Sequence, residues 1–265
     1  MHPLLHPGRH PVVGHRGASG AAPENTLASL DLALAESAEV LEFDVHLAAD
    51  GVPVLLHDPS LDRTTNQSGP VRARTSTELS AVDAGYRFTP DGGASFPWRG
   101  RGCGIPTLRE VLERYPHTPI LLELKSVEAA EPVRRLLEEL QAQERTVVAS
   151  FLEPALAPFR AGAICTAASR GAIRSLWLRA LVGLPAPRLQ DRIYAVPDRY
   201  RDRLHIPTER FIRAARAAGY PVHVWTVDDP DRAKLLWGRG ACGMITNYPA
   251  RLLAERNRLF PAERA

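Results

Sequence analysis

The sequence predicts an α/β fold, a (β/α)8 TIM barrel with a cap segment inserted after the hairpin of its second strand. Short apolar strands alternate with amphipathic helices along most of the 265 residues, and this alternation is typical of a parallel sheet. Eight such strands can be counted, the number that closes this type of barrel. A doubly wound open sheet is the alternative, but no glycine-rich phosphate loop follows the first strand.

The predicted elements are mostly joined by short connections. The strands are expected over residues 11–15, from residue 41 onward, and over 120–124, 146–150, 164–167, 192–196, 222–227 and 243–246. The helices are expected over residues 27–38, 107–115, 130–143, 153–160, 173–181, 208–218, 230–237 and 250–259. Apolar residues at helical spacing place the first helix, and Asn25-Thr26 cap its start.

Residues 41–58 are predicted to form a hairpin that carries chemical groups. Glu42 and Asp44 lie two residues apart, so both side chains leave the same side of the strand. Two partly buried carboxylates repel each other unless a cation lies between them. The turn at Asp50-Gly51 is too short for a parallel crossover, so the return arm is antiparallel and brings His57 back toward the carboxylates. An ordinary edge hairpin with surface acids is the alternative.

Residues 59–106 are rich in turn formers and show only a short helical pattern, around residues 77–82. A long irregular segment inside a compact domain is usually a lid or binding insertion, or else disordered. The aromatic residues Tyr86, Phe88 and Phe96 favour order. We therefore expect residues 1–265 to form one domain, with this segment as a cap.

Composition excludes several classes of protein. With 45% hydrophobic and 24% charged residues the chain is globular, and a net charge of +3 with scattered basic residues does not indicate nucleic-acid binding. The three cysteines have no zinc or disulfide spacing, which fits a reducing compartment. Residues 175–187 are the most apolar run but are too short to span a bilayer. We expect a cytoplasmic protein with a small-molecule partner and no stable membrane insertion; the oligomeric state is not indicated.

Polar side chains gather where the predicted strands end, and active sites of (β/α)8 barrels lie at that edge. The residues expected there are His15, Arg16, Glu42, Asp44, His57, Glu123, Lys125 and Trp225. Taken singly, each has an ordinary structural reading, such as a solvated strand end or core packing. Their coincidence at one edge predicts a site.

The residue types at this edge indicate phosphoester chemistry. Glu42, Asp44 and Glu123 offer only oxygen ligands, which suits Ca²⁺ or Mg²⁺ better than zinc. Arg16 and Lys125 place positive charge beside that cation, which indicates an anionic substrate, most simply a phosphate. Two histidines that titrate near neutral pH can serve as acid and base. The sequence therefore predicts phosphodiester cleavage.

Six motifs occur in order over nearly the whole chain. They are GHRGASGAAPENTLASL, LEFDVHLAADGVPVLLHDPSLDRTT, IPTLREVL, LLELK, VHVWTVDDP and GMITNYPARL. Together they resemble the glycerophosphodiester phosphodiesterase family. The resemblance implies a TIM barrel with an inserted cap, a divalent cation that is often Ca²⁺ or Mg²⁺, and hydrolysis of glycerophosphodiesters to sn-glycerol 3-phosphate and an alcohol.

By position in these motifs, the resemblance also implies roles for single residues. His15 and His57 match the acid/base pair, and Arg16 and Lys125 match phosphate contacts. The residues that match metal ligands are Glu42, Asp44 and Glu123. Glu24 would support the metal or Arg16, and Trp225 would form a wall of the pocket. Neither the order of the two histidines nor the nucleophile, water or a glycerol hydroxyl of the substrate, follows from the sequence.

The last strand departs from the family pattern DGIITD, because residues 242–247 read CGMITN; we expect these positions to be structural. Two other functions remain as alternatives. A lysophospholipase D-like enzyme would need an apolar tail groove, for which Phe88, Phe96, Trp98 and residues 177–184 are candidates. A catalytically silent barrel would bind a phosphodiester without cleaving it.

Overall fold

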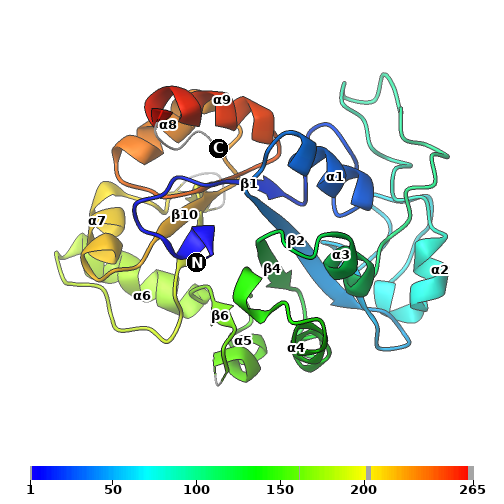
Figure 1. Ribbon diagram of the computed structural model, residues 1–265, viewed down its shortest axis with the longest axis horizontal. Helices are drawn as coiled ribbons and strands as arrows, with labels where there is room; N and C mark the ends of the chain where they lie inside the picture. Colours follow the sequence, from blue (N-terminus) through cyan, green and yellow to red (C-terminus); the bar gives the residue numbers. More distant parts are fainter. Residues whose placement is uncertain (1, 161, 201–203, 262–265) are drawn as a thin grey trace.

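A curled sheet of parallel strands forms the centre of the molecule (Figure 1). The computed structural model describes residues 2–160, 162–200 and 204–261. Eight strands follow one another in the order β6-β5-β4-β2-β1-β11-β10-β7, and every neighbouring pair is parallel. They are β1 Val12–His15, β2 Val40–Leu47, β4 Ile120–Leu124, β5 Thr146–Ala149, β6 Cys165–Thr166, β7 Tyr194–Pro197, β10 Val222–Trp225 and β11 Met244–Thr246. The predicted α/β fold with eight parallel strands is confirmed.

The two end strands of this sheet, β6 and β7, are joined through the residues beside them. Ala167 and Ile193 form an isolated parallel bridge. The Ala168 N–H donates to the Ile193 carbonyl at 2.8 Å, and the Arg192 N–H donates to the Thr166 carbonyl at 2.8 Å. The sheet is therefore curled far enough for its two ends to share main-chain hydrogen bonds.

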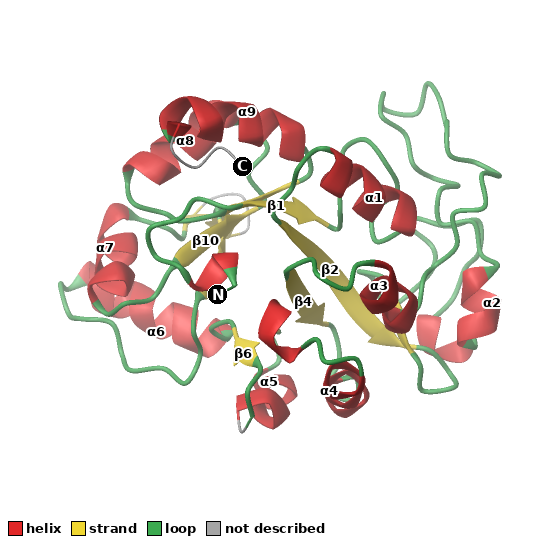
Figure 2. Cartoon of the chain, viewed as in Figure 1, coloured by secondary structure: helices red, strands yellow, loops and turns green. Residues whose placement is uncertain are grey.

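Helices surround the sheet on its outer side (Figure 2). They are α1 Leu27–Ala35, α2 Ser76–Ser80, α3 Leu108–Arg114, α4 Ala130–Glu139, α5 Glu153–Arg160, α6 Arg170–Leu181, α7 Glu209–Ala217, α8 Pro230–Gly238 and α9 Pro249–Leu259. The helix predicted over 130–143 ends early, at Glu139, because Gln141 takes a positive φ of 53° that stops an α-helix. None of the helices in the described part of the chain has the length and apolar character that a membrane crossing demands.

One hairpin adds a strand to the parallel sheet, and a second hairpin forms a separate two-stranded sheet. The predicted one is confirmed: β3 Pro53–Leu55 runs antiparallel to β2, with Val45 opposite Leu55, and Gly51 has a φ of 75° in the turn. The second, β8 Arg199–Tyr200 with β9 Leu204–His205, is not predicted from the sequence. Each of its arms is two residues long, too short for an alternating pattern to be recognised.

Residues 59–106 form long loops and α2, at the right of Figure 1. The helix begins with a capping box in which Thr75 and Glu78 exchange hydrogen bonds. The segment and the hairpin share one apolar cluster, formed by Ala48, Val54, Leu56, Leu61, Val71, Leu79, Val82, Ala84 and Ile105. The segment is thus ordered by packing against the hairpin that carries His57.

The N-terminal residues fill the concave side of the curled sheet at the end where the strands begin. Leu4, in the 3-10 helix Pro3–Leu5, is fully buried among residues such as Val13, Val40 and Ile245. His223 links this segment to the sheet: its Nδ1 accepts the Gly243 N–H at 3.0 Å, so its Nε2–H donates to the Leu4 carbonyl at 2.9 Å. This tautomer uses both ring nitrogens while the ring stays neutral.

We expect His223 to make stability depend on pH. Burial lowers its pKa to about 4. Between pH 6.5 and 4 this histidine is therefore protonated in the unfolded chain but stays neutral in the folded chain. The free energy of unfolding should therefore fall by roughly 3 kcal/mol for this group as pH drops from 6.5 toward 4. His223→Gln keeps a donor and an acceptor without titrating, and its stability should decline less steeply over that range. Denaturant titrations of both proteins from pH 7.5 to 4.5 test this, and parallel curves would contradict it.

Candidate active site

A pocket opens where the parallel strands end. Seven of the nine predicted site residues line it: His15, Arg16, Glu42, His57, Glu123, Lys125 and Trp225. The other two lie immediately behind it. Asp44 is only 1% exposed and forms ion pairs with Arg16 and Lys125, while Glu24 forms an ion pair with Arg16. The structure thus brings all nine predicted residues into one site.

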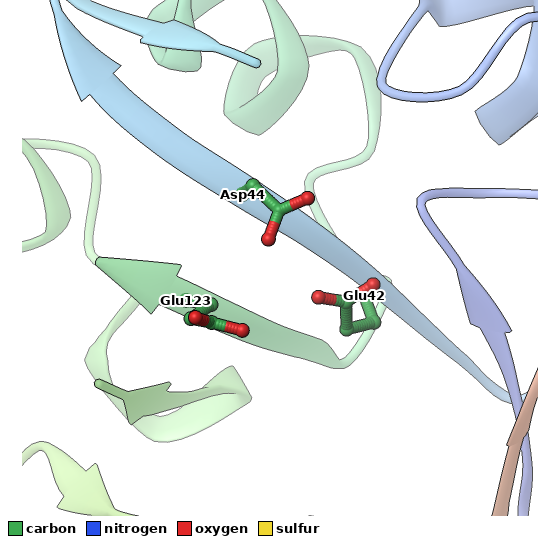
Figure 3. Close-up of side chains that lie close together, drawn as sticks. All are labelled: Glu42, Asp44 and Glu123. Atoms are coloured by element: carbon green, nitrogen blue, oxygen red, sulfur yellow. The ribbon is translucent and has the colours of Figure 1, made fainter. Parts of the chain in front are cut away.

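Three carboxylates, those of Glu42, Asp44 and Glu123, face one another at this site (Figure 3). Glu42 and Asp44 leave the same side of β2, and the parallel register places Glu123 of β4 directly beside Asp44. Each residue offers a carboxylate oxygen, and these oxygens lie within 4.8 Å of one another. Burial and the neighbouring Asp44 raise the pKa of Glu42 well above its ordinary value, and burial also raises the pKa of Glu123. Such a cluster is electrostatically costly without a cation.

Two fixed cations compensate part of this charge. Lys125 Nζ lies 2.8 Å from Asp44 Oδ1 and 2.7 Å from Glu123 Oε1, and Arg16 Nε lies 3.0 Å from Asp44 Oδ2. Burial would raise the pKa of Asp44, but Lys125 and Arg16 outweigh it and lower that pKa. Three carboxylates against two cations leave one negative charge in an all-oxygen donor set. The donor set therefore fits a hard divalent cation.

Asn25 also holds Asp44 in place, a contact that the sequence does not reveal. Its side-chain Nδ2–H donates to Asp44 Oδ2 at 2.9 Å, and its Oδ1 accepts the Asp44 backbone N–H at 3.1 Å. The sequence assigns Asn25 to the cap of α1, but Thr26 is the residue that caps the helix. The left-handed backbone of Asn25, with a φ of 57°, directs its side chain toward β2 instead.

His57 is oriented by a carboxylate. Its Nδ1 lies 2.6 Å from Asp58 Oδ1, which leaves Nε2 free to face the pocket. Arg63 holds that carboxylate in turn, donating from Nε to Asp58 Oδ2 at 2.6 Å. Burial would raise the pKa of Asp58, but the hydrogen bonds from Arg63 and His57 lower it to about 2. Asp58 therefore stays ionised beside His57.

Arg63 connects the carboxylate that orients His57 to the carboxylate that contacts Arg16. The sequence gives Arg63 no role beyond a turn. Its NH1 and NH2 donate to the two oxygens of Glu24 at 2.7 Å each, while its Nε is bound to Asp58. Glu24 also accepts from Arg16 at 2.8 Å. Glu24 thus contacts the two arginines and is not a member of the carboxylate cluster. Its contact with Arg16 helps to hold that guanidinium in position.

His15 has a neutral partner instead. Its Nδ1 lies 2.7 Å from Asn247 Oδ1, while Asn247 Nδ2 donates to Asp228 Oδ2 at 2.7 Å. Because the amide nitrogen is used by Asp228, the amide oxygen accepts from His15, and His15 Nε2 carries the lone pair. Burial lowers the pKa of His15 to about 4, and the charge of Arg16 acts in the same direction. Asn247, expected to be purely structural, therefore fixes the tautomer of His15.

The opposite side of the pocket is apolar. Trp225 lies at the end of β10, and its ring centroid is 5.8 Å from that of Phe151. Leu121, Ala149 and Ala195 line the same pocket. The pocket therefore combines a charged half on β1, β2 and the end of β4 with an apolar half formed by Leu121 of β4 and by residues of β5, β7 and β10.

Comparisons with known proteins agree with this geometry. A model of the glycerophosphoryl diester phosphodiesterase family matches residues 15–251. A glycerophosphodiester phosphodiesterase of Caldanaerobacter subterraneus is 30% identical over 249 residues, covering 91% of this chain and 96% of the relative. A mouse lysophospholipase D is 27% identical, covering 94% and 84%. The solved structure of an Oleispira antarctica phosphodiesterase in complex with the product sn-glycerol-3-phosphate is 30% identical, with a TM-score of 0.75 over 92% of this chain and 96% of that one.

Replacing one carboxylate of the cluster should have two separate effects on stability, one from reduced charge repulsion and one from weakened cation binding. In EDTA at pH 7.5, Glu42→Gln should be more stable than the parent, because an acid whose pKa is raised by folding destabilises the folded state above its unfolded pKa. Ca²⁺ or Mg²⁺ at a hundred times its dissociation constant should stabilise the parent by about 2.7 kcal/mol, and Glu42→Gln much less. Glu113→Gln, an exposed glutamate on α3, is the control. Thermal denaturation measures both effects, and a full cation effect in Glu42→Gln would refute the assignment.

Proposed function

The chain belongs to the glycerophosphoryl diester phosphodiesterase family, and we propose that it hydrolyses glycerophosphodiesters to sn-glycerol 3-phosphate and an alcohol. One observation carries this proposal: three carboxylates, two cations and two differently held histidines meet in a single pocket. In the overall reaction water adds across one P–O bond, so that the phosphate keeps the glycerol and the head group leaves as an alcohol. The product bound in the Oleispira antarctica relative is the one that this reaction forms.

We assign the divalent cation to Glu42, Asp44 and Glu123, and we propose Ca²⁺ or Mg²⁺ because every donor is an oxygen. When bound, such a cation neutralises charge on the phosphoryl oxygens. Arg16 and Lys125 border the same pocket and are assigned to the phosphate, which they attract and orient. Glu24 is assigned to the support of Arg16, and Trp225 to the wall of the pocket.

We assign His15 as the general base and His57 as the general acid. His15 is held as a neutral ring with its lone pair on Nε2, the form that accepts a proton from the attacking hydroxyl. His57 is oriented by the ionised carboxylate of Asp58 at its Nδ1, and its Nε2 is the atom from which a proton passes to the leaving alkoxide. The same assignment serves water or a glycerol hydroxyl of the substrate as nucleophile, since either must lose a proton on attack.

The fold in this proposal is a complete (β/α)8 barrel in one domain, residues 1–265, with residues 59–106 as its cap. The hydrogen bonds between the residues flanking β6 and β7 support closure of the barrel. The contacts of Arg63 with Asp58 and Glu24 support a cap that contributes to the site. Among the described residues no disulfide joins any of the three cysteines, which supports a cytoplasmic location.

A second candidate function is lysophospholipase D-like hydrolysis of lysophospholipids. The apolar half of the pocket, with Leu121, Phe151 and Trp225, favours it because it offers a surface for a lipid tail. The mouse relative carries that enzyme name. Comparing turnover of glycerophosphocholine with that of a lysophosphatidylcholine separates the two functions, since only the lipid-tailed substrate gains from an apolar surface.

The purified protein should release sn-glycerol 3-phosphate from glycerophosphodiesters, and EDTA should abolish the release. Restoring Ca²⁺, Mg²⁺ or Mn²⁺ one at a time should recover turnover with at least one cation, because the carboxylate cluster needs a counter-ion. The measurement is an enzyme-coupled assay of the released product. Binding of a glycerophosphodiester without turnover under every metal condition would instead establish a catalytically silent barrel.

The two histidines should respond differently to the leaving group. With an alcohol leaving group, His15→Ala and His57→Ala should each lower kcat by a factor on the order of 10²–10⁴. With a p-nitrophenyl ester of glycerol 3-phosphate, the leaving group needs no proton, so His57→Ala should regain most of the lost rate and His15→Ala should not. His117→Ala, an exposed histidine outside the pocket, is the control. The opposite pattern of recovery would reverse the two assignments.

A further inference from the structure

Phe151 lies on the boundary between two pockets. On one side it lines the active-site pocket next to Trp225. On the other side it lines a second cavity, which lies between α5 and α6 and includes Ser169, Arg188 and Gln190. A head group that leaves the phosphate toward β5 and β6 would therefore pass over Phe151 and reach this second cavity.

Arg170, the first residue of α6, occupies one face of the Phe151 ring. Its guanidinium carbon lies 5.1 Å from the ring centroid. Arg170 is exposed, and it forms no ion pair with any carboxylate of the described residues. The guanidinium is thus held at the edge of the pocket by an aromatic ring, with its hydrogen-bond donors still available.

The polar groups deeper in the second cavity are arranged rigidly. Asp191 accepts from Arg160 Nε at 2.9 Å and from the Thr166 hydroxyl at 2.6 Å, and Arg160 also pairs with Glu153. In contrast, the side chains of Arg188 and Gln190 make no hydrogen bond to any described residue. The cavity therefore offers the hydrogen-bond donors of Arg188 and Gln190 beside side chains that are held in place by Asp191.

We propose that Phe151, Arg170, Arg188 and Gln190 form a subsite for the head group of the substrate, and that it selects polyhydroxylated head groups without positive charge, such as glycerol or inositol. This inference rests on the proposed function. Hydroxyl oxygens accept hydrogen bonds from the free guanidinium and amide donors. A quaternary ammonium would normally bind an aromatic face, but here Arg170 already occupies that face of Phe151 and repels a second cation.

The test compares kcat/KM for glycerophosphoinositol, glycerophosphoglycerol and glycerophosphocholine under one metal condition. The wild-type protein should prefer the inositol ester over the choline ester by a factor on the order of five or more. Arg170→Ala should shrink this ratio, and Arg170→Glu should reverse it, because a carboxylate on the ring attracts the ammonium group. Arg174→Glu, one helical turn further along α6 and not stacked on Phe151, makes the same change in net charge and should leave the ratio unchanged.

Preference of the wild-type protein for the choline ester would overturn the subsite while leaving the phosphodiesterase function intact. Equal shifts in Arg170→Glu and Arg174→Glu would also overturn it, since they would reveal a long-range charge effect rather than a contact. Absence of turnover with all three substrates would refute the proposed function itself, and the subsite with it.

Discussion

The site depends on the burial of Asp44. A carboxylate that is 1% exposed cannot remain ionised without partners, and here both of its oxygens are engaged by Lys125, Arg16 and Asn25. These partners come from the residue after β4, from the end of β1 and from the segment before α1, so three separate segments hold the ionised Asp44. Removal of one partner from such a buried arrangement typically costs about 3–5 kcal/mol. The charge of one residue therefore fixes the relative positions of several elements.

A chain of paired charges also connects this site to the segment that follows the hairpin. Arg16 is partnered by Glu24, Glu24 by Arg63, and Arg63 by Asp58, which orients His57. Each link compensates a charge that the fold has partly removed from water. Residues 59–106 thus do more than cover apolar surface, because Arg63 links Arg16, at the end of β1, to His57 on the hairpin through Glu24 and Asp58.

Sequence patterns predict the parallel sheet and eight of the nine candidate residues because both follow from local rules, whereas Glu24 follows only from the family resemblance. Alternating strands and helices indicate a parallel sheet, and residues at strand ends meet at one edge. Arg63, Asn25 and Asn247 are not predicted, because their contacts span 39, 19 and 232 residues and no periodicity relates the partners. The β8–β9 hairpin is missed for another reason, the shortness of its two arms. Strands and helices can thus be predicted from the sequence. The pairs that charged and polar side chains form between distant segments at the carboxyl ends of the strands cannot.

Asn247 stands where the family pattern DGIITD has an aspartate, and this difference changes the charge beside His15. An aspartate at this position would place a negative charge beside His15, as Asp58 does beside His57, and the two histidines would then have partners of the same charge. The neutral amide, oriented by Asp228, accepts the His15 N–H without adding charge. Its oxygen also accepts from the Ser19 hydroxyl at 2.7 Å, which anchors it from a third direction. The two histidines of the pocket therefore differ in the charge of the partner that holds them, a neutral amide for His15 and a carboxylate for His57.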